Sequence, residues 1–195
     1  MGSLTSSRLV FCEPGQDDAD AVFRVHGDPR TYAHHPSWVM VDPTQAREVP
    51  ASWRAHWQEH GFGYAVLRRR ADPESRMGDE IRVGDEGTQG LDPPVRAGEI
   101  LGFAGLKWQT VLGHRVLNLY YRLAPEAWGQ GYATEAAQAL VHWAAEHHPD
   151  TPVLARVALA NPASQHAAES AGLVLIPETD PQDPVPHRIL LSRPW

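Results

Sequence analysis

The sequence contains one cysteine, no long apolar run and no excess of basic residues. Cys12 cannot form a disulfide within the chain, so nothing in the sequence points to an oxidising compartment. No apolar run approaches the roughly 18 residues that a membrane-spanning helix needs, and the polar stretch 1–8 lacks the apolar core of a signal peptide. We therefore expect a cytoplasmic protein with no membrane partner. The net charge of −7 argues against a nucleic-acid partner, because nucleic-acid-binding surfaces are basic.

The length and the aromatic content fit a folded domain with a packed core. The chain has 195 residues, of which 42% are hydrophobic, and it contains seven Trp. Residues 71–98 depart from this composition, because they are rich in Asp, Glu, Gly, Pro and Arg and contain few apolar side chains. The predicted organisation is a single domain over 1–195 with a flexible insertion at 71–98.

Hydrophobic periodicity predicts an α/β fold with elements in the order β-α-α-β-β-β-α-β-α-β-β. The expected strands are 8–11, 63–69, 100–106, 115–123, 153–160, 173–176 and 187–191, and the expected helices are 17–26, 44–60, 132–148 and 161–171. Pro50 should kink or split the second helix. Because a helix joins the strands at 115–123 and 153–160, these two should run parallel, whereas strands joined by short turns should pair antiparallel.

The most informative segment joins a predicted strand to the clearest predicted helix. The strand ends at Leu123, and a turn containing Gly129 and Gly131 leads directly into a helix at Tyr132. The first N–H groups of a helix have no partner within it and lie at the positive end of its dipole. Glycine also allows the backbone to approach a ligand closely. The turn is therefore a predicted anion site, most simply for a phosphate.

Two nucleotide-binding motifs can be compared with this turn. The dinucleotide fingerprint requires a third glycine where this chain has Thr134, and an acidic residue after the next strand, which ends at Ala160-Asn161. The phosphate-binding loop of ATP- and GTP-binding proteins requires Gly-Lys-Ser/Thr, which the turn lacks. A nucleotide-binding enzyme of another class is therefore the less favoured alternative.

Two segments resemble motifs of a known enzyme family. The acetyl-CoA loop of GNAT N-acetyltransferases, in the version of the ribosomal-protein (RimJ/RimL-like) branch, resembles Pro125-Glu126-Ala127-Trp128-Gly129-Gln130-Gly131-Tyr132-Ala133-Thr134-Glu135-Ala136. The second motif of that group resembles Asn161-Pro162-Ala163-Ser164 followed by Glu169-Ser170-Ala171-Gly172-Leu173. The resemblance covers nearly the whole chain apart from 71–98. It implies the GNAT fold, a central twisted mixed sheet of six to seven strands flanked by about four helices, with a splayed parallel pair that holds acetyl-CoA.

The resemblance also implies which residues bind the cofactor. Contacts are expected from Leu119, Tyr121, Leu123, Trp128, Gly129, Gln130, Gly131, Tyr132, Ala133, Thr134 and Asn161. The strand residues would pair with the pantetheine arm, and the N–H groups of 130–134 would bind the pyrophosphate. Ser164 would stabilise or protonate the leaving thiolate. From the residues alone, Asn161 is a helix N-cap and Ser164 an ordinary first-turn residue.

The implied reaction is direct attack of a primary amine on the thioester, with backbone N–H groups polarising the carbonyl. Many relatives carry a Glu base at the position of Asn118, and Asn cannot act as a base. His34 and His35 are then the preferred candidates for the catalytic base, because histidine has a suitable pKa. Further candidates are Glu99, His114 and His187. The alternative function is a catalytically idle GNAT-fold module that binds acyl-CoA as a sensor or partner.

No motif specifies the amine acceptor. A protein N-terminus, a small-molecule amine, a polyamine and an aminoglycoside all remain open, with specificity expected in 28–43 and 177–187. An α-amine, whose pKa lies at about 7.7–8.0, is easier to deprotonate than a Lys amine at about 10.4. We assign no metal site and expect a monomer or a homodimer.

Overall fold

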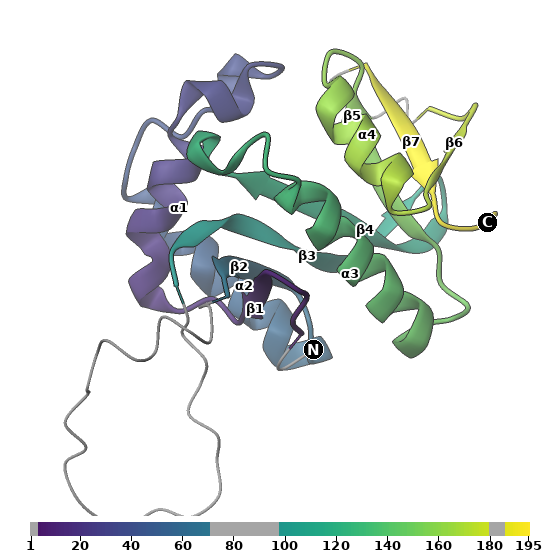
Figure 1. Cartoon of the computed structure of the whole chain (residues 1–195), viewed down its shortest axis with the longest axis horizontal. Coiled ribbons are helices and arrows are strands. Elements are labelled where there is room, and N and C mark those ends of the chain that lie inside the picture. Colours follow the sequence, from purple (N-terminus) through teal and green to yellow (C-terminus); the bar gives the residue numbers. More distant parts are fainter. Residues whose placement is uncertain (1–3, 71–97, 180–185) are drawn as a thin grey trace, which may run out of the picture.

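The computed structural model describes residues 4–70, 98–179 and 186–195, which form a seven-stranded sheet with helices on both faces (Figure 1). The strands are β1 (Leu9–Cys12), β2 (Tyr64–Arg69), β3 (Ile100–Val111), β4 (His114–Leu123), β5 (Val153–Ala158), β6 (Val174–Ile176) and β7 (His187–Leu191). The α-helices are α1 (Ala19–His26), α2 (Gln45–His60), α3 (Tyr132–His147) and α4 (Pro162–Ser170). Short 3-10 helices are η1 (Gln16–Asp18), η2 (Pro29–Tyr32), η3 (Pro36–Trp38) and η5 (Pro125–Ala127). The insertion predicted at 71–98 lies outside the described residues except for Gly98.

The sheet combines antiparallel neighbours with one parallel pair. Its strand order is β1-β2-β3-β4-β5-β7-β6. β4 and β5 run parallel and are joined through α3, whereas every other neighbouring pair in the described sheet is antiparallel. The predicted α/β class and the predicted parallel pair are therefore confirmed, together with the predicted order of strands and α-helices.

The hairpin of β3 and β4 is longer than the sequence suggests. The predicted strand 100–106 continues to Val111, and β4 pairs with it from His114 onward. Leu112 and Gly113 have φ angles of 51° and 82°, which form the tight turn that suits two twisted antiparallel strands. The polar run after Leu106 interrupts the apolar pattern, and only the pairing with β4 makes it a strand.

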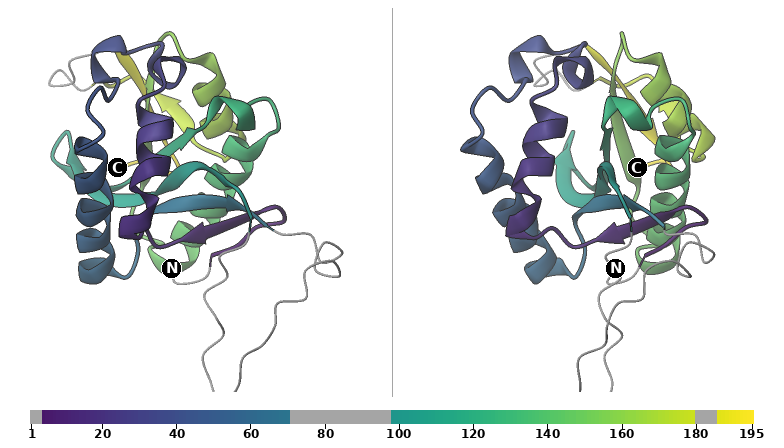
Figure 2. Two further views of the ribbon diagram at one scale, coloured as in Figure 1. Left: turned by 90° about the vertical axis from the view of Figure 1, so that its left-hand side faces the viewer. Right: turned by 60° about the vertical axis from the view of Figure 1, so that its left-hand side comes forward.

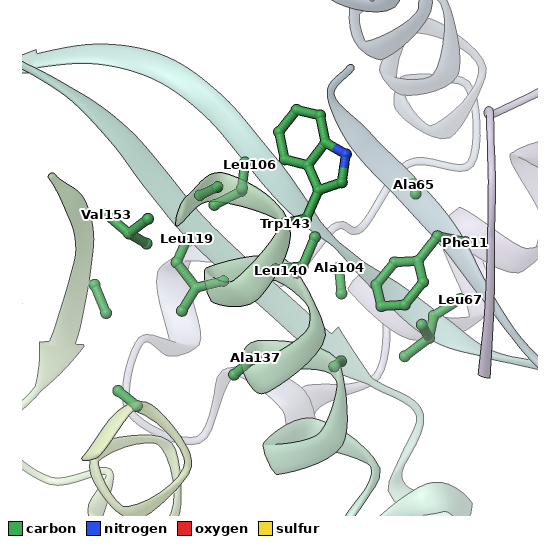
Figure 3. Packing of buried hydrophobic residues seen from close by; sticks show 14 of the residues in the cluster. Phe11, Ala65, Leu67, Ala104, Leu106, Leu119, Ala137, Leu140, Trp143 and Val153 are labelled. Atoms are coloured by element: carbon green, nitrogen blue, oxygen red, sulfur yellow. The ribbon is translucent and has the colours of Figure 1, made fainter. Parts of the chain in front are cut away.

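Different helices cover the two faces of the sheet: α1 and α2 lie on one face, and α3 and α4 lie on the other (Figure 2). The larger core lies beneath α3, where Leu140 and Trp143 pack with Leu106 and Leu119 of the strands (Figure 3). Beneath α1 and α2 a second core contains Val22, Val25, Trp53, Val66 and Phe103. Successive residues of β4 therefore point into different layers, which decides the surroundings of each site residue.

Helix α2 contains Pro50 and is nevertheless continuous from Gln45 to His60. Proline lacks an N–H, so this position loses the hydrogen bond to the carbonyl four residues earlier. Pro50 is buried on the same face as Ala46 and Trp53, and the burial of this face offsets the loss. Pro50 therefore does not split the helix, and the alternative expectation of a kink stays a prediction. Gly61, in the left-handed region at φ 73°, caps the helix, which ends at His60 as predicted.

Candidate functional site

The loop between β4 and α3 presents backbone N–H groups that have no partner. It passes through η5 and then through Gly129 and Gly131, whose φ angles of 72° and 77° lie in the left-handed region that favours glycine. The N–H of Trp128 donates to η5, and that of Glu135 donates to the carbonyl of Gly131. The N–H groups of residues 129–134, which lie between Trp128 and Glu135 in the chain, donate to no group in the described part of the chain. Together with the α3 dipole, these groups favour an anion.

The space in front of this loop is open. Among the described residues, a Cβ atom added to Gly129 would meet no atom within 4 Å, and one added to Gly131 would meet only the Arg8 guanidinium, at 3.5 Å. Gly129, Gln130 and Gly131 are all exposed. A ligand of the size of a diphosphate can therefore approach the N–H groups directly, so the residues present fit the pyrophosphate of a nucleotide cofactor.

Strands β4 and β5 separate after a short paired stretch. Their register in the described residues includes Leu117 with Val153 and Asn118 with Leu154, and it ends there. β4 nevertheless stays paired with β3 as far as Leu123. The two parallel strands therefore diverge beyond Asn118, as the predicted fold requires.

The divergence leaves hydrogen-bonding groups open along one edge of β4. The N–H of Leu117 points toward β5, where it donates to the carbonyl of Pro152 at 2.9 Å. Main-chain groups alternate in direction along a strand, so those of Leu119, Tyr121 and Leu123 point the same way. No described strand pairs with these three residues on that side. They are the strand residues predicted to contact the cofactor arm, and an extended chain can pair with them as an added strand.

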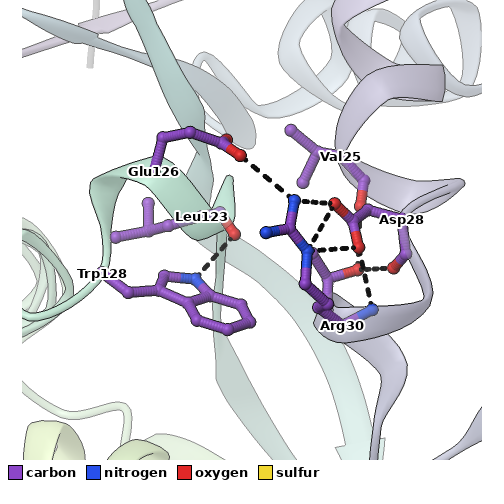
Figure 4. A network of polar contacts seen from close by, with 7 residues as sticks. Val25, Asp28, Arg30, Leu123, Glu126 and Trp128 are labelled. Carbon is purple, nitrogen blue, oxygen red and sulfur yellow. Dashed lines mark hydrogen bonds and ion pairs between the residues drawn. The ribbon is translucent and has the colours of Figure 1, made fainter.

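Trp128 closes one end of this edge. Its indole Nε1 donates to the carbonyl oxygen of Leu123 at 3.0 Å, while 47% of the residue remains exposed (Figure 4). The carbonyl oxygen of Leu123 is thus already bonded to Trp128, and the N–H of Leu123 is the group left for a ligand. Beside Trp128, the Arg30 guanidinium donates to Asp28 at 2.6 Å and to Glu126 of η5 at 3.1 Å (Figure 4). These contacts tie the segment after α1 to the loop that leads into α3.

The start of α4 brings Ser164 and Tyr121 together. Asn161 Oδ1 accepts a hydrogen bond from the N–H of Ser164 at 3.0 Å, so Asn161 is the N-cap that the sequence predicts. Ser164 Oγ donates to Tyr121 Oη at 3.0 Å, and the Tyr121 hydroxyl donates to the carbonyl of Ser164 at 2.7 Å. Burial raises the pKa of Tyr121 to about 12, although the hydrogen bond with Ser164 opposes the shift. The Tyr121 hydroxyl therefore keeps its proton at neutral pH.

The sequence places these features in a known family. The profile of the acetyltransferase (GNAT) domain matches residues 8–174. The chain belongs to the GNAT acetyltransferase family. The protein is accordingly an acetyltransferase, and acetyl-CoA is the acetyl donor. The open anion site and the open edge of β4 suit the two halves of this cofactor, which carries a pyrophosphate and an extended pantetheine arm.

Solved structures share the fold of this acetyltransferase. The acetyltransferase from Agrobacterium tumefaciens strain C58 has a TM-score of 0.71 at 22% identity, over 100% of this chain and 95% of that chain. RimL, a ribosomal L7/L12 α-N-protein acetyltransferase in complex with coenzyme A, has a TM-score of 0.65 at 13% identity, over 97% and 96%. The spermidine N-acetyltransferase from Vibrio cholerae, in complex with CoA and spermine, has a TM-score of 0.61 at 14% identity, over 95% and 94%.

A curated relative matches a smaller part of the acetyltransferase. The uncharacterized protein YkkB from Bacillus subtilis (strain 168) is 33% identical over 78 residues. These residues make up 40% of this chain and 45% of YkkB, so the match spans less than half the length of that relative.

Residues before β1 clamp the first turn of α3. Glu135 Oε1 accepts hydrogen bonds from Ser6 Oγ at 2.7 Å, Ser7 Oγ at 2.8 Å and the N–H of Arg8 at 2.8 Å. Arg8 also donates through Nε to Glu135 at 2.7 Å and through Nη1 to the carbonyl of Gln130 at 3.0 Å. Sequence patterns did not reveal this clamp, because Arg8 and Glu135 are 127 positions apart in the chain. The one sequence feature that could have indicated the clamp is the acidic Glu135 in the first turn of the helix. Acidic residues are favourable at that position even without a partner, so Glu135 alone does not predict Arg8 as its partner.

The residues considered as a catalytic base are dispersed. Asn118 Nδ2 donates to Tyr64 Oη at 2.8 Å, so this amide is held by a tyrosine. His34 is exposed between η2 and η3, and His35 stacks on Trp38 with ring centroids 4.1 Å apart. In the described part of the chain, neither histidine side chain forms a hydrogen bond with β4 or α4. Their role as a base stays a prediction.

A second polar cluster, which sequence reasoning did not identify, lies on the β4 face beneath α1. Tyr120 Oη lies 3.2 Å from His26 Nε2, and His26 Nδ1 lies 2.8 Å from Tyr32 Oη. Burial and then the charge of Arg122 lower the pKa of His26 to about 4. The Arg122 guanidinium lies over the Tyr32 ring, 3.7 Å from its centroid, and also donates to the carbonyl of Thr31. This imidazole is therefore neutral at physiological pH.

Other predicted features concern metals, membranes and the cysteine. Within 4–70, 98–179 and 186–195, no group of three or more His, Cys, Asp or Glu could hold a metal ion. No helix in those same ranges is long and apolar enough to cross a membrane. Cys12 is half-buried at the end of β1.

Proposed function

We propose that this acetyltransferase moves the acetyl group of acetyl-CoA to a primary amine by direct attack of the amine on the thioester. The observation that carries the proposal is the continuity of two open features. The N–H groups of 129–134 suit a pyrophosphate, and the β4 edge from Leu119 to Leu123 suits an extended arm that pairs like a strand. A cofactor with both groups would bind across the loop and the strand.

The proposed cofactor-binding residues lie along the β4 edge, in the loop and first turn of α3, and at the N-cap of α4. The residues are Leu119, Tyr121, Leu123, Trp128, Gly129, Gln130, Gly131, Tyr132, Ala133, Thr134 and Asn161. Peptide N–H groups of the loop bind the diphosphate, while the Trp128 indole and the buried Tyr132 ring hold the loop in place. N–H groups of the β4 edge would polarise the acetyl carbonyl as negative charge develops on its oxygen.

We assign Ser164 to the leaving thiolate. Its hydroxyl donates to the Tyr121 hydroxyl, which in turn donates to the Ser164 carbonyl, so Tyr121 fixes the position of Ser164 beside the β4 edge. Both hydroxyls keep their protons at neutral pH, and a hydroxyl can donate a hydrogen bond or a proton to a developing thiolate. His34 and His35 are the proposed bases on the acceptor side.

The proposed acceptor is an α-amine, or another amine of similar pKa, as in the RimJ/RimL-like branch. An α-amine loses its proton more readily than a Lys amine, which favours it where no carboxylate stands at 118. The similar folds described above carry names that specify different acceptors, a ribosomal protein and spermidine, so acceptor choice would reside in the segments 28–43 and 177–187. We propose one domain over 1–195, a cytoplasmic location and a monomeric or homodimeric state.

A second candidate is a module that binds acyl-CoA without turnover. The observation in its favour is Asn118, which cannot accept a proton and whose side chain is held by Tyr64. Such a module would keep the anion site and the β4 edge and would lack amine-dependent thiol release.

One experiment separates the candidates. Thermal unfolding is followed with acetyl-CoA, NAD and ATP, because a ligand at 100 times its Kd stabilises the folded state by about 2.7 kcal/mol. Thiol release from acetyl-CoA is then measured with peptide α-amines, Lys side-chain amines, polyamines and aminoglycosides. The proposed enzyme is stabilised by acetyl-CoA and releases thiol with an amine. Stabilisation without release from any amine favours the binding module, and stabilisation by NAD or ATP alone refutes both.

A further inference from the structure

Tyr120 lies on β4 just beyond the last residue that pairs with β5. Its side chain belongs to the layer under α1 and α2, on the face opposite to Tyr121. In the sheet register Tyr120 lies opposite Gly105, which in turn lies opposite Tyr64 of β2. Because Gly105 has no side chain, the rings of Tyr64 and Tyr120 pack over it with centroids 4.6 Å apart.

The Tyr120 hydroxyl begins a continuous hydrogen-bonded chain through His26 to Tyr32, with the distances of 3.2 and 2.8 Å given above. Both tyrosines are partly exposed, whereas His26 between them is 8% exposed. A neutral imidazole has one N–H and one acceptor nitrogen, so it can receive a hydrogen bond from one hydroxyl and donate to the other. The chain thus joins the divergence of β4 and β5 to the surface near η2.

The surroundings of His26 contain one charge. Its neighbours are Tyr32 of η2, Trp53 of α2, Phe103 of β3, and Tyr120 and Arg122 of β4. The two tyrosines are the titratable neighbours, Arg122 is the cation, and no carboxylate contacts this imidazole among the described residues. Burial and Arg122 both disfavour the charged, doubly protonated form of His26. The imidazole is therefore suited to receive a proton on one nitrogen while it releases a proton from the other.

We propose that Tyr120, His26 and Tyr32 conduct a proton from the acceptor amine to water, with Tyr120 as the catalytic residue that touches the amine. The inference rests on the function proposed above. The anion loop and α4 lie on one face of the sheet, whereas the partly exposed side chain of Tyr120 lies on the other face, two residues beyond the last pairing of β4 with β5. The chain supplies an exit for the proton that Asn118 cannot accept, and it takes the place of His34 and His35 as the route for that proton.

The proton balance is complete. An ammonium acceptor loses two protons as its nitrogen bonds to the acetyl carbon and the carbon–sulfur bond breaks. The first passes to Tyr120 Oη while the Tyr120 proton moves to His26 Nε2, the His26 Nδ1 proton moves to Tyr32 Oη, and the Tyr32 proton enters water. The second proton goes to the thiolate sulfur, so each turnover yields amide, thiol and one proton in solution. The imidazole returns to its first tautomer by the reverse shift, with water in place of the amine.

The test uses simple primary amines of decreasing basicity, ethylamine, glycinamide and 2,2,2-trifluoroethylamine, as probe acceptors at pH 7. Y120F is expected to lower kcat/KM for ethylamine about 100-fold, the lower range for loss of proton transfer, and to spare the mostly neutral trifluoroethylamine. Y32F should show the same pattern, because it removes the exit of the chain. The matched control is Y64F, which removes a hydroxyl of the neighbouring ring that is not bonded to His26 and should keep the wild-type ratio between amines.

Equal losses for all amines in Y120F would mean that Tyr120 only supports the fold, and would overturn the inference. A second measurement needs no variant: nitrogen NMR of wild-type His26 should show a neutral imidazole at pH 7, and a protonated one would also overturn it. If the wild type binds acetyl-CoA but releases no thiol with any amine, the proposed function fails and this inference fails with it. If the wild type acetylates amines and Y120F loses the same factor of kcat/KM for all three amines, the proposed function stands and only the proton chain is refuted.

Discussion

The Arg8 guanidinium lies 2.7 Å from the carboxylate of Glu135 and also donates to the carbonyl of Gln130 at 3.0 Å. It thereby joins the chain before β1 to both the anion loop and the first turn of α3. Partial burial opposes ionisation of Glu135, but the donors on Ser6, Ser7 and Arg8 outweigh it, and the pKa of Glu135 is lowered. The ionised carboxylate is therefore part of the structure that presents the loop.

Replacing Arg8 by Ala should weaken acetyl-CoA binding by about 3- to 10-fold, since a single charge-assisted contact contributes on the order of 1 kcal/mol. The loop loses its hydrogen bond at Gln130, and Glu135 loses its cation. Calorimetric titration with acetyl-CoA measures the change. R54A is the control, because Arg54 of α2 forms an exposed ion pair with Glu13 at 3.8 Å, and α2 covers the other face of the sheet. Equal affinity of R8A and R54A would show that the clamp does not shape the loop.

Replacing Gly131 by Val should abolish detectable acetyl-CoA binding while leaving the fold intact. A side chain at φ 77° is strained by about 1–2 kcal/mol and would displace the N–H groups beside it. Gly113, at φ 82° in the β3–β4 turn, offers a matched control with the same backbone strain and open space around it. Circular dichroism and acetyl-CoA titration compare the variants. Undiminished binding by G131V would count against the pyrophosphate assignment.

Tyr121 and Ser164 should act as one unit on the leaving group. Y121F and S164A are each expected to lower kcat about 10-fold or more, with little change in acetyl-CoA affinity. Because the two hydroxyls bond each other, the double variant should lose much less than the product of the single losses. Steady-state kinetics on all four proteins gives the coupling. Independent, multiplicative losses would exclude the shared role.

Acid should destabilise the fold through His26. The folded-state pKa is about 4 and the unfolded value is 6.5, so the unfolded chain binds more protons between these limits. Stability is complete above pH 6.5 and declines as the pH falls toward 4, by roughly 3 kcal/mol at 1.36 kcal/mol per pKa unit. Urea unfolding across this range should show that the free energy of unfolding declines less steeply with falling pH in H26Q than in the wild type. The control is H142Q, because His142 is exposed, and it should decline as the wild type does. If H26Q also declines as steeply as the wild type, His26 is not the source of the acid sensitivity.

Local patterns were sufficient for the framework of the fold. The end of the helix at His60, the cap at Asn161 and the glycine turn before Tyr132 all depend on neighbours within a few residues, and the structure has each of them. Sequence reasoning failed where a local rule met a tertiary contact. Pro50 stays within a continuous helix because its face is buried, and β3 extends past Leu106 because β4 pairs with it.

The sequence by itself determined the element order, the parallel crossover and the open anion loop, because capping, periodicity and glycine conformation act over short stretches of chain. Only the tertiary structure decided which side chains meet. Tyr120 and Tyr121 are neighbours in sequence, yet the alternation of β4 directs one toward His26 and the other toward Ser164, 94 and 43 residues away. Strand register and helix packing decide which residues far apart in the sequence come into contact. Neither can be inferred from the few residues that flank a given position.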